Sequence, residues 1–198
     1  NLLGEVSATI TVRVWNAVYY VATNGSDAAD GLSWATAKQT LQAAVDACNV
    51  PGGIIWATNG IYDAGGRAMY GLSNRVLITL PVTLRSVNGP DVTSILGAED
   101  PNTTNSLGLG SNAVRCVTLQ QGATLSGFTV SGGRTLAEAD DMASEMAMIF
   151  QITAGGIFCE SHAESVSNCV ISSCASKDYA GGVFKGRITH TTIQDNES

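Results

Sequence analysis

Residues 155–174 (GGIFCESHAESVSNCVISSC) and residues 181–196 (GGVFKGRITHTTIQDN) are two copies of one pattern. Each copy begins with a Gly-Gly pair, continues with short apolar-alternating stretches, and ends among Ser, Asn or Asp residues that favour turns. Cys169 and Thr191 take equivalent places in the two copies and lie 22 residues apart. Units of this length, built from several short strands without helix-length apolar patterns, predict an all-β solenoid of the parallel β-helix type.

The alternation along each short strand predicts which side chains point inward, because successive strand residues face opposite sides of a sheet. We align Val130 with Ile171 and Ile193, and we extend the same inward columns back to Val82 and Leu84. The positions between and beside these columns should then form a polar outer surface that suits sugars and that any soluble β-helix also needs. The candidate ligand-binding residues of this surface are Thr83, Arg85, Thr129, Ser131, Thr192 and Gln194.

A helix should precede the strand-rich region. Leu41, Ala44, Val45 and Cys48 follow the i, i+3, i+4, i+7 spacing of one helix face, and the Pro-Gly-Gly that starts at Pro51 ends the pattern. A solenoid exposes core and unpaired backbone at its end, so this short helix is expected to act as an N-terminal cap.

Four stretches carry a family resemblance, and they read YYVATNGSDAADGLSWATAKQTLQAAVDAC (19–48), GGIIWATNGIY (52–62), NRVLITLPVTLRSVNGP (74–90) and GATLSGFTVSGG (122–133). Together they resemble the opening of secreted bacterial right-handed parallel β-helix proteins of the pectate-lyase-like superfamily. The GGIF and GGVF repeats also resemble large bacterial surface proteins and autotransporter-like adhesins. The resemblance implies a right-handed parallel β-helix and an extracellular or cell-surface location. It implies no particular activity, because the same opening precedes lyases, hydrolases, epimerases and non-catalytic surface proteins.

We divide the chain into residues 1–16 and a β-helix over residues 17–198, with residues 17–62 as the cap and first coil. Residues 8–15 alternate like a half-buried strand, which fits the end of a preceding domain, an arm that covers the solenoid, or a strand donated to a neighbour. At the other end the chain stops without a terminal cap, as if cut within the ladder.

One insertion interrupts the repeat at residues 134–154. The interval from Phe128 to Cys169 is 41 residues, nearly twice that of the next coil. The insertion is expected to contain a short helix, and it is either a flap over a binding groove or a helix packed on the solenoid wall.

Composition and charge limit the kinds of partner that the chain can be expected to bind. The formal net charge of −7 disfavours nucleic acid and anionic membrane surfaces as partners, and the sequence contains no apolar run long enough for a transmembrane helix. A polysaccharide or cell-surface glycan is the expected partner.

Cysteines and acidic turns offer weaker sites. Cys116 and Cys159 are taken as neighbours in one column, where they are either buried thiols or a stacked disulfide. Asp27 and Asp30 lie in a Gly-rich loop that suits calcium or an ordinary turn, and no cofactor is required. Zinc is not expected, because the chain lacks a CxxC pair.

The best acid and base neighbourhood comprises Glu160, Lys177, Asp178 and Lys185. A polysaccharide lyase needs a base for proton abstraction, usually with carboxylates that hold a cation. Surface salt bridges explain the same four residues more simply, and no pair among them has the spacing of a catalytic motif.

Three hypotheses for function follow. The leading one is a non-catalytic extracellular module that serves as a rigid scaffold and adhesive surface toward glycans or neighbouring copies. The second is a lyase-like enzyme that acts on acidic glycans. The third is a self-assembling filament subunit that uses the N-terminal strand and the open C-terminal coil.

Overall fold

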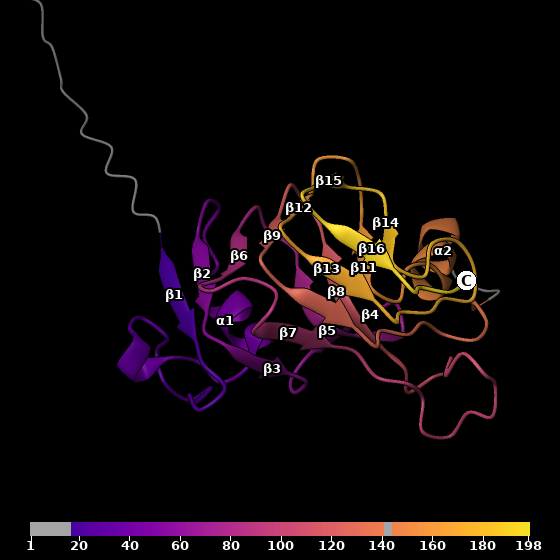
Figure 1. Ribbon diagram of the computed structural model, residues 1–198, viewed down its shortest axis with the longest axis horizontal. Helices are drawn as coiled ribbons and strands as arrows, with labels where there is room; N and C mark the ends of the chain where they lie inside the picture. The colour runs from indigo at the N-terminus through magenta and orange to yellow at the C-terminus, as the bar shows by residue number, and fades with distance from the viewer. Residues whose placement is uncertain (1–16, 141–143) are drawn as a thin grey trace, which may run out of the picture.

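The computed structural model describes residues 17–140 and 144–198 (Figure 1). The alternating segment 8–15 lies outside the described residues, so its predicted role as an arm, a donated strand or a domain end stays a prediction. In the view of Figure 1, β1 lies at one end of the long axis, while α2 and the C-terminus lie at the other.

Three sheets make up the molecule. Sheet A contains β1 (Val18–Val21), β2 (Ile54–Ala57), β6 (Thr83–Ser86), β9 (Thr124–Ser126), β12 (Ser165–Ser167) and β15 (Arg187–Thr189). Sheet B contains β3 (Gly60–Tyr62), β7 (Thr93–Leu96), β10 (Thr129–Ser131), β13 (Val170–Ser172) and β16 (Thr192–Gln194). Sheet C contains β4 (Arg67–Met69), β5 (Leu72–Ile78), β8 (Val114–Leu119), β11 (Ile157–Cys159) and β14 (Val183–Phe184). All neighbouring strands pair in parallel except β4 and β5, which are antiparallel.

The chain visits the three sheets in turn. From β2 it passes through β3 to β5, from β6 through β7 to β8, from β9 through β10 to β11, and from β12 through β13 to β14. Each visit adds one strand to the same edge of each sheet. The structure therefore consists mostly of parallel sheets with few helices, in a β-helix-like arrangement.

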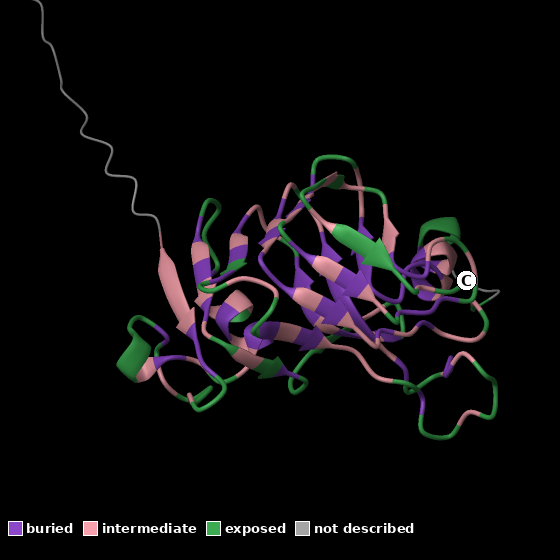
Figure 2. Cartoon of the chain, viewed as in Figure 1, coloured by how far each residue is buried: buried purple, intermediate pink, exposed green. Residues whose placement is uncertain are grey.

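The core lies between the three sheets. One inward column runs through Leu84, Leu125, Val166 and Ile188 of sheet A, and another through Ile95, Val130, Ile171 and Ile193 of sheet B. Figure 2 shows this alternation as bands of buried and half-buried residues along the central strands. The inward side chains of the middle coils are fully buried, which is the main apolar contribution to stability.

Short turns between sheets A and B set the register of the coils. Two residues connect the sheet A strand to the sheet B strand in each of three coils, at 127–128, 168–169 and 190–191. The first residue of each turn has a positive φ, which is 82° at Gly127, 51° at Asn168 and 50° at His190. Such a conformation lets the chain bend sharply from sheet A to sheet B within two residues, and Gly and Asn adopt it at low cost.

The register corrects one sequence alignment. Leu84 aligns with Leu125 on sheet A, whereas Val130 aligns with Ile95 on sheet B. Thr83 and Arg85 therefore lie on the outer face of sheet A, and the other four candidate ligand residues, Thr129, Ser131, Thr192 and Gln194, lie on sheet B. The predicted single surface is wrong, because β6 belongs to sheet A, whereas the strands with which its pattern was aligned belong to sheet B.

The cysteine column is corrected in the same way. Cys159 is in register with Leu119, not with Cys116, and all five cysteines are free and buried. Cys116 lies instead near Cys174: its thiol donates to the carbonyl of Ser131 at 3.1 Å, and the Cys174 thiol donates to the neighbouring carbonyl of Val130 at 3.9 Å. The predicted common column of Cys116 and Cys159, and with it the stacked disulfide, is therefore wrong, whereas the alternative of buried thiols agrees with the structure.

Two helices accompany the sheets. The α1 helix (Leu41–Ala47) packs against β5, β1 and β2. Its Gln42 side chain exchanges two hydrogen bonds with the backbone of Leu77, at 2.7 and 3.2 Å. A 3-10 helix, η1 (Trp34–Thr36), precedes it. The α2 helix (Glu145–Ile152) lies in the predicted insertion, between β10 and β11.

The outer face of sheet C is covered. The outward column of this sheet consists of Leu77, Thr118 and Phe158, and none of these residues is more than 4% exposed. The insertion contributes Phe150 and Ala154, which form a second small core with Leu72 and Phe158. Of the two expectations for the insertion, the α2 contacts match a helix packed on the wall. Met146 of α2 is 49% exposed.

Candidate functional site

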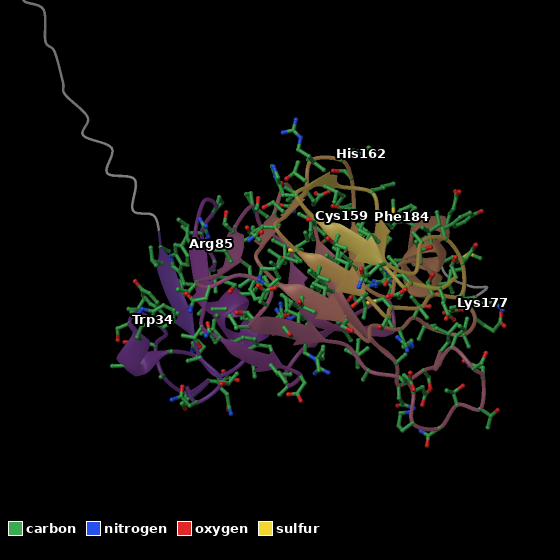
Figure 3. The ribbon with its side chains drawn as sticks, in the orientation of Figure 1. Trp34, Arg85, Cys159, His162, Lys177 and Phe184 are labelled. Atoms are coloured by element: carbon green, nitrogen blue, oxygen red, sulfur yellow. The ribbon has the colours of Figure 1, made fainter. Side chains whose placement is uncertain are left out.

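The predicted acid and base residues fall into two groups. Lys177 forms an exposed ion pair with Glu138 at 3.2 Å, and Asp178 lies beside it in the chain, accepting a hydrogen bond from the Tyr179 N–H at 3.0 Å. Lys185 donates to the backbone carbonyl of Glu160 at 3.4 Å. In Figure 3, Lys177 lies well apart from Phe184, the residue that precedes Lys185.

The two groups do not join through any contact between described residues. The Lys185 ammonium lies 5.0 Å from the Phe184 ring centroid, and the Glu160 carboxylate accepts from the Gln120 amide at 3.3 Å. Each ionisable group therefore has an ordinary surface partner. An acid and a base that act on one bond must both come within hydrogen-bond reach of it.

The predicted calcium residues serve the turn that carries them. The Asp27 carboxylate accepts from the backbone N–H groups of Gln39 and Thr40, both at 2.8 Å, and from the Thr40 hydroxyl at 2.8 Å. Asp30 accepts from the Leu32 N–H at 2.9 Å, and this bond lowers the pKa of the Asp30 carboxyl. Within the described ranges, no group of three or more His, Cys, Asp or Glu residues is arranged to hold a metal ion.

Sheet B presents polar side chains on its outer face, which we call the sheet B ladder, namely Thr129, Ser131, Ser172, Thr192 and Gln194. Register places Ser131, Ser172 and Gln194 in one outward column, and Thr129 and Thr192 in the other with Val170 between them. Neighbouring strands lie about 4.8 Å apart, so hydroxyl and amide groups recur at that interval along the face. Ser94 and Leu96 extend the two columns onto β7.

A hollow opens beside the sheet B ladder. Its volume is about 310 Å³, at the lower end of the range for small-molecule sites. It is lined by Ser106 and Leu107 from the β7–β8 loop, by Arg134, by the segment 173–175, and by Asp195 and Glu197. Four successive coils therefore contribute to one concave surface.

Arg134 is the fixed point of the hollow. Its guanidinium donates to the Ser173 carbonyl at 2.7 Å, to the Gly133 carbonyl at 3.1 Å, and to the Glu99 carboxylate at 2.7 Å. Its side chain is only 13% exposed, and its Nε is buried without a partner among the described residues. The hydrogen bonds hold the cation rigidly against three coils.

The loop that closes the hollow is held by Asp100. The backbone N–H groups of Asn112 and Asn102 donate to its carboxylate at 3.0 and 2.9 Å, and they keep the pKa of this carboxyl below its ordinary value. A long loop tied in this way presents Ser106 and Leu107 in a defined position.

Sequence reasoning missed Arg134 and Glu99 as site residues, and it left Ser172 out of the candidate list although the alternation places this residue on the outer face. Ser172 follows directly from the alternation that identified Ser131. Arg134 and Glu99 lie in irregular segments of different coils, where no periodicity marks them.

No helix among the described residues is long and apolar enough to cross a membrane.

Comparisons with known proteins complete the description. No protein-family model matches the sequence, and no curated protein matches it either. Similar solved structures include a rhamnogalacturonan lyase, with a TM-score of 0.48 and 14% identity over 89% of this chain and 50% of that one. They also include a pectin methylesterase mutant in complex with a hexasaccharide, with a TM-score of 0.43 and 13% identity over 92% of this chain and 50% of that one.

A lacto-N-biosidase from Eubacterium ramulus is more distant, with a TM-score of 0.39 and 13% identity over 91% of this chain. The chain spans half of the first two structures and 27% of the third. What these proteins act on is a property of theirs and is not carried over to this chain by such similarity.

Proposed function

We propose that this chain is a right-handed β-helix solenoid that acts as a non-catalytic, extracellular glycan-binding module. Its coils form a rigid support, and the sheet B ladder with the hollow at Arg134 forms the binding surface. Right-handed connections are the rule for parallel strands joined by crossovers, which supports the handedness.

The observation that carries the proposal is the sheet B ladder itself. Hydroxyl and amide side chains lie in register on consecutive strands, at a spacing comparable to the length of one sugar residue. Sugar hydroxyls both donate and accept hydrogen bonds, as do Ser, Thr and Gln side chains. The rigid sheet holds these groups in place before the ligand binds, which reduces the entropy lost on binding.

The non-catalytic part rests on the contacts of the four acid and base candidates. Lys177 is paired with Glu138, and Lys185 contacts the backbone of Glu160 in a separate region. A lyase-like enzyme needs such groups to converge on one substrate atom.

The experiment is a glycan array followed by titration of the best ligand, with every reaction also assayed for new reducing ends and unsaturated products. We expect binding without cleavage. The double variant Ser131→Ala/Ser172→Ala should bind about tenfold more weakly, because each lost hydrogen bond contributes about 0.5–1.5 kcal/mol. The matched control Thr124→Ala/Ser165→Ala removes two hydroxyls from the outer face of sheet A and should bind the array ligand as the wild type does.

Other outcomes would identify the alternatives. Cleavage that is lost in Lys177→Met or Lys185→Met would establish the lyase-like enzyme and overturn the non-catalytic module. Filaments seen by light scattering and negative-stain microscopy, without glycan binding, would establish self-assembly as the function instead.

A further inference from the structure

We infer a second binding site on the outer face of sheet A, where Trp34, Tyr20, Trp56 and Arg85 form a row that binds a sugar chain carrying anionic groups. We call these four residues the aromatic row. The inference does not depend on the sheet B ladder, because the two faces belong to different sheets and share no residue.

The aromatic row is built by strand register. Tyr20 on β1 aligns with Trp56 on β2, and Trp56 aligns with Arg85 on β6, so the three side chains occupy one outward column. Trp34 of η1 extends the row, with its ring centroid 4.5 Å from that of Tyr20 and an interplanar angle of 61°. Figure 3 labels the two ends of the row, Trp34 and Arg85.

The row lies opposite a complete core, so the fold does not use these rings as its interior. The inward neighbours Ile55 and Leu84 are fully buried on the other side of the same strands. Trp34 is 46% exposed, and Tyr20 and Trp56 are half-buried. Large aromatic surfaces that remain in contact with water on a soluble protein mark sites of interaction.

Arg85 gives the row its chemical preference. Its guanidinium carbon lies 4.6 Å from the centroid of the Trp56 ring, which restrains the planar cation over an aromatic face. Arg85 is exposed, and a guanidinium binds carboxylate or sulfate through paired N–H donors. The rings supply flat apolar surfaces for the C–H faces of sugars. Arg85 thus places a positive charge beside the rings in a chain whose net charge is −7, and this charge favours an anionic ligand.

The outward column of sheet A that contains Trp56 and Arg85 continues with residues that carry hydroxyl groups. Beyond Arg85, the same outward register runs through Ser126, Ser167 and Thr189, and the Ser167 hydroxyl donates to that of Ser126 at 3.1 Å. Strands about 4.8 Å apart thus offer first aromatic rings, then a cation, then hydroxyls. The ligand chain should lie across the strands, with an acidic sugar at Trp56 and Arg85 and the following sugars over the serines.

Intrinsic fluorescence provides a local readout, because two of the three tryptophans of the chain belong to the aromatic row. The probes are a hexamer of galacturonate, a sulfated heparin hexasaccharide and a neutral galactan hexamer, each titrated at low and high salt. We expect the fluorescence to change with the anionic probes, and the affinity to fall as salt rises. The carboxylated and sulfated probes distinguish the two sources of negative charge.

Variants separate charge from stacking. Arg85→Met should weaken binding of an anionic probe about tenfold, as expected for the loss of a charge-assisted hydrogen bond, and should reduce the salt dependence. Trp56→Ala should weaken it at least as much, and Trp56→Phe, which keeps a ring, should recover part of the affinity. Arg187→Met, which removes another exposed arginine from the outer face of sheet A, is the matched control and should bind as the wild type does.

Three results would overturn the inference. The first is an equal affinity for the neutral and the anionic probes. The second is binding of the anionic probes that is unchanged in both Arg85→Met and Trp56→Ala. The third is a molecular mass, measured by light scattering, that is lower for Trp56→Ala than for the wild type. The last result would make the aromatic row a contact between copies of the chain. Failure of the sheet B ladder would be recognised separately, because Ser131→Ala/Ser172→Ala leaves the fluorescence titration unchanged if the aromatic row is an independent site.

Discussion

The outer faces of sheet A and sheet C are built from equivalent strands of the same coils, yet one is open and the other is covered. On sheet C the outward residues Thr118 and Phe158 are 0% and 3% exposed, whereas on sheet A the outward residue Arg85 is exposed. The difference comes from the connections. The turns from sheet A to sheet B are very short, whereas segments such as 97–113 and 132–156 join sheet B to sheet C. Insertion length at one corner therefore decides which face becomes core and which remains free to bind.

Arg115 and Arg85 show the same contrast in one residue type. Arg115 is fully buried beneath α2, where it donates to the backbone carbonyls of Phe150, Thr153 and Ala154 and lies 4.2 Å from the Phe150 ring centroid. The carbonyls at the end of a helix carry partial negative charge and lack helical partners, so Arg115 caps α2. Burial lowers the pKa of Arg115 to about 9.

The largest expected effect comes from removing the cover of sheet C. Phe150→Ala should lower the free energy of unfolding by about 4 kcal/mol, because it leaves a cavity between Leu72 and Phe158. Trp56→Ala on sheet A should lower it by less than about 1 kcal/mol, since that ring is half-buried. Urea titrations of both variants measure the difference, and equal losses would contradict the distinction between the two faces.

The two arginines provide the next test. Arg115→Met should lower the free energy of unfolding by about 2–3 kcal/mol, because it removes the charged donor and leaves buried carbonyls without partners. Arg85→Met should change stability by no more than about 0.5 kcal/mol. Amide hydrogen exchange should show faster exchange in α2 for Arg115→Met, and unchanged exchange there would contradict the capping role.

A pH test addresses the corner between sheets C and A. The buried Glu164 carboxylate accepts from the Gly122 N–H at 3.1 Å, the Ser161 N–H at 2.7 Å and the Ser161 hydroxyl at 3.0 Å. Burial raises the pKa of this carboxyl, but the hydrogen bonds outweigh burial and hold the pKa below its ordinary value. The folded pKa is thus lower than the unfolded one, so the stabilisation is complete above the unfolded pKa and is lost as the pH falls through the folded pKa.

Glu164→Gln should therefore be about 1–2 kcal/mol less stable than the wild type at pH 7, and the gap should narrow in acid. Denaturant midpoints measured between pH 7 and pH 3 test this. A gap that stays constant over that range would show that the charge of Glu164 contributes nothing to the corner.

The smallest effect is expected at the exposed ion pair of the insertion. The side chains of Lys177 and Glu138 are 46% and 82% exposed, so solvent screens their attraction. Lys177→Met should change the melting temperature by no more than about 2 °C, and it should leave glycan binding unchanged. A loss of glycan binding in this variant would show that Lys177 belongs to the glycan-binding site.

The fold was more predictable than the site. The Gly-Gly repeats and the alternation at Val130, Ile171 and Ile193 predicted a β-helix-like coil, and the register of sheet B agrees with those columns. The alignment failed at Val82 and Leu84, where a short strand fits the pattern of either sheet. Alternation distinguishes the inside of a coil from the outside, but it does not distinguish one side of the coil from another.

By itself, the sequence determined which side chains face the core, where tight turns fall, and that a long insertion follows β10, because these depend on local periodicity and turn chemistry. Only the tertiary structure decided that α2 covers sheet C, that Arg115 is buried, and that Tyr20, Trp34, Trp56 and Arg85 form one row. Each of those features joins residues from different coils, and their contact depends on the stacking of strands that are far apart in the chain.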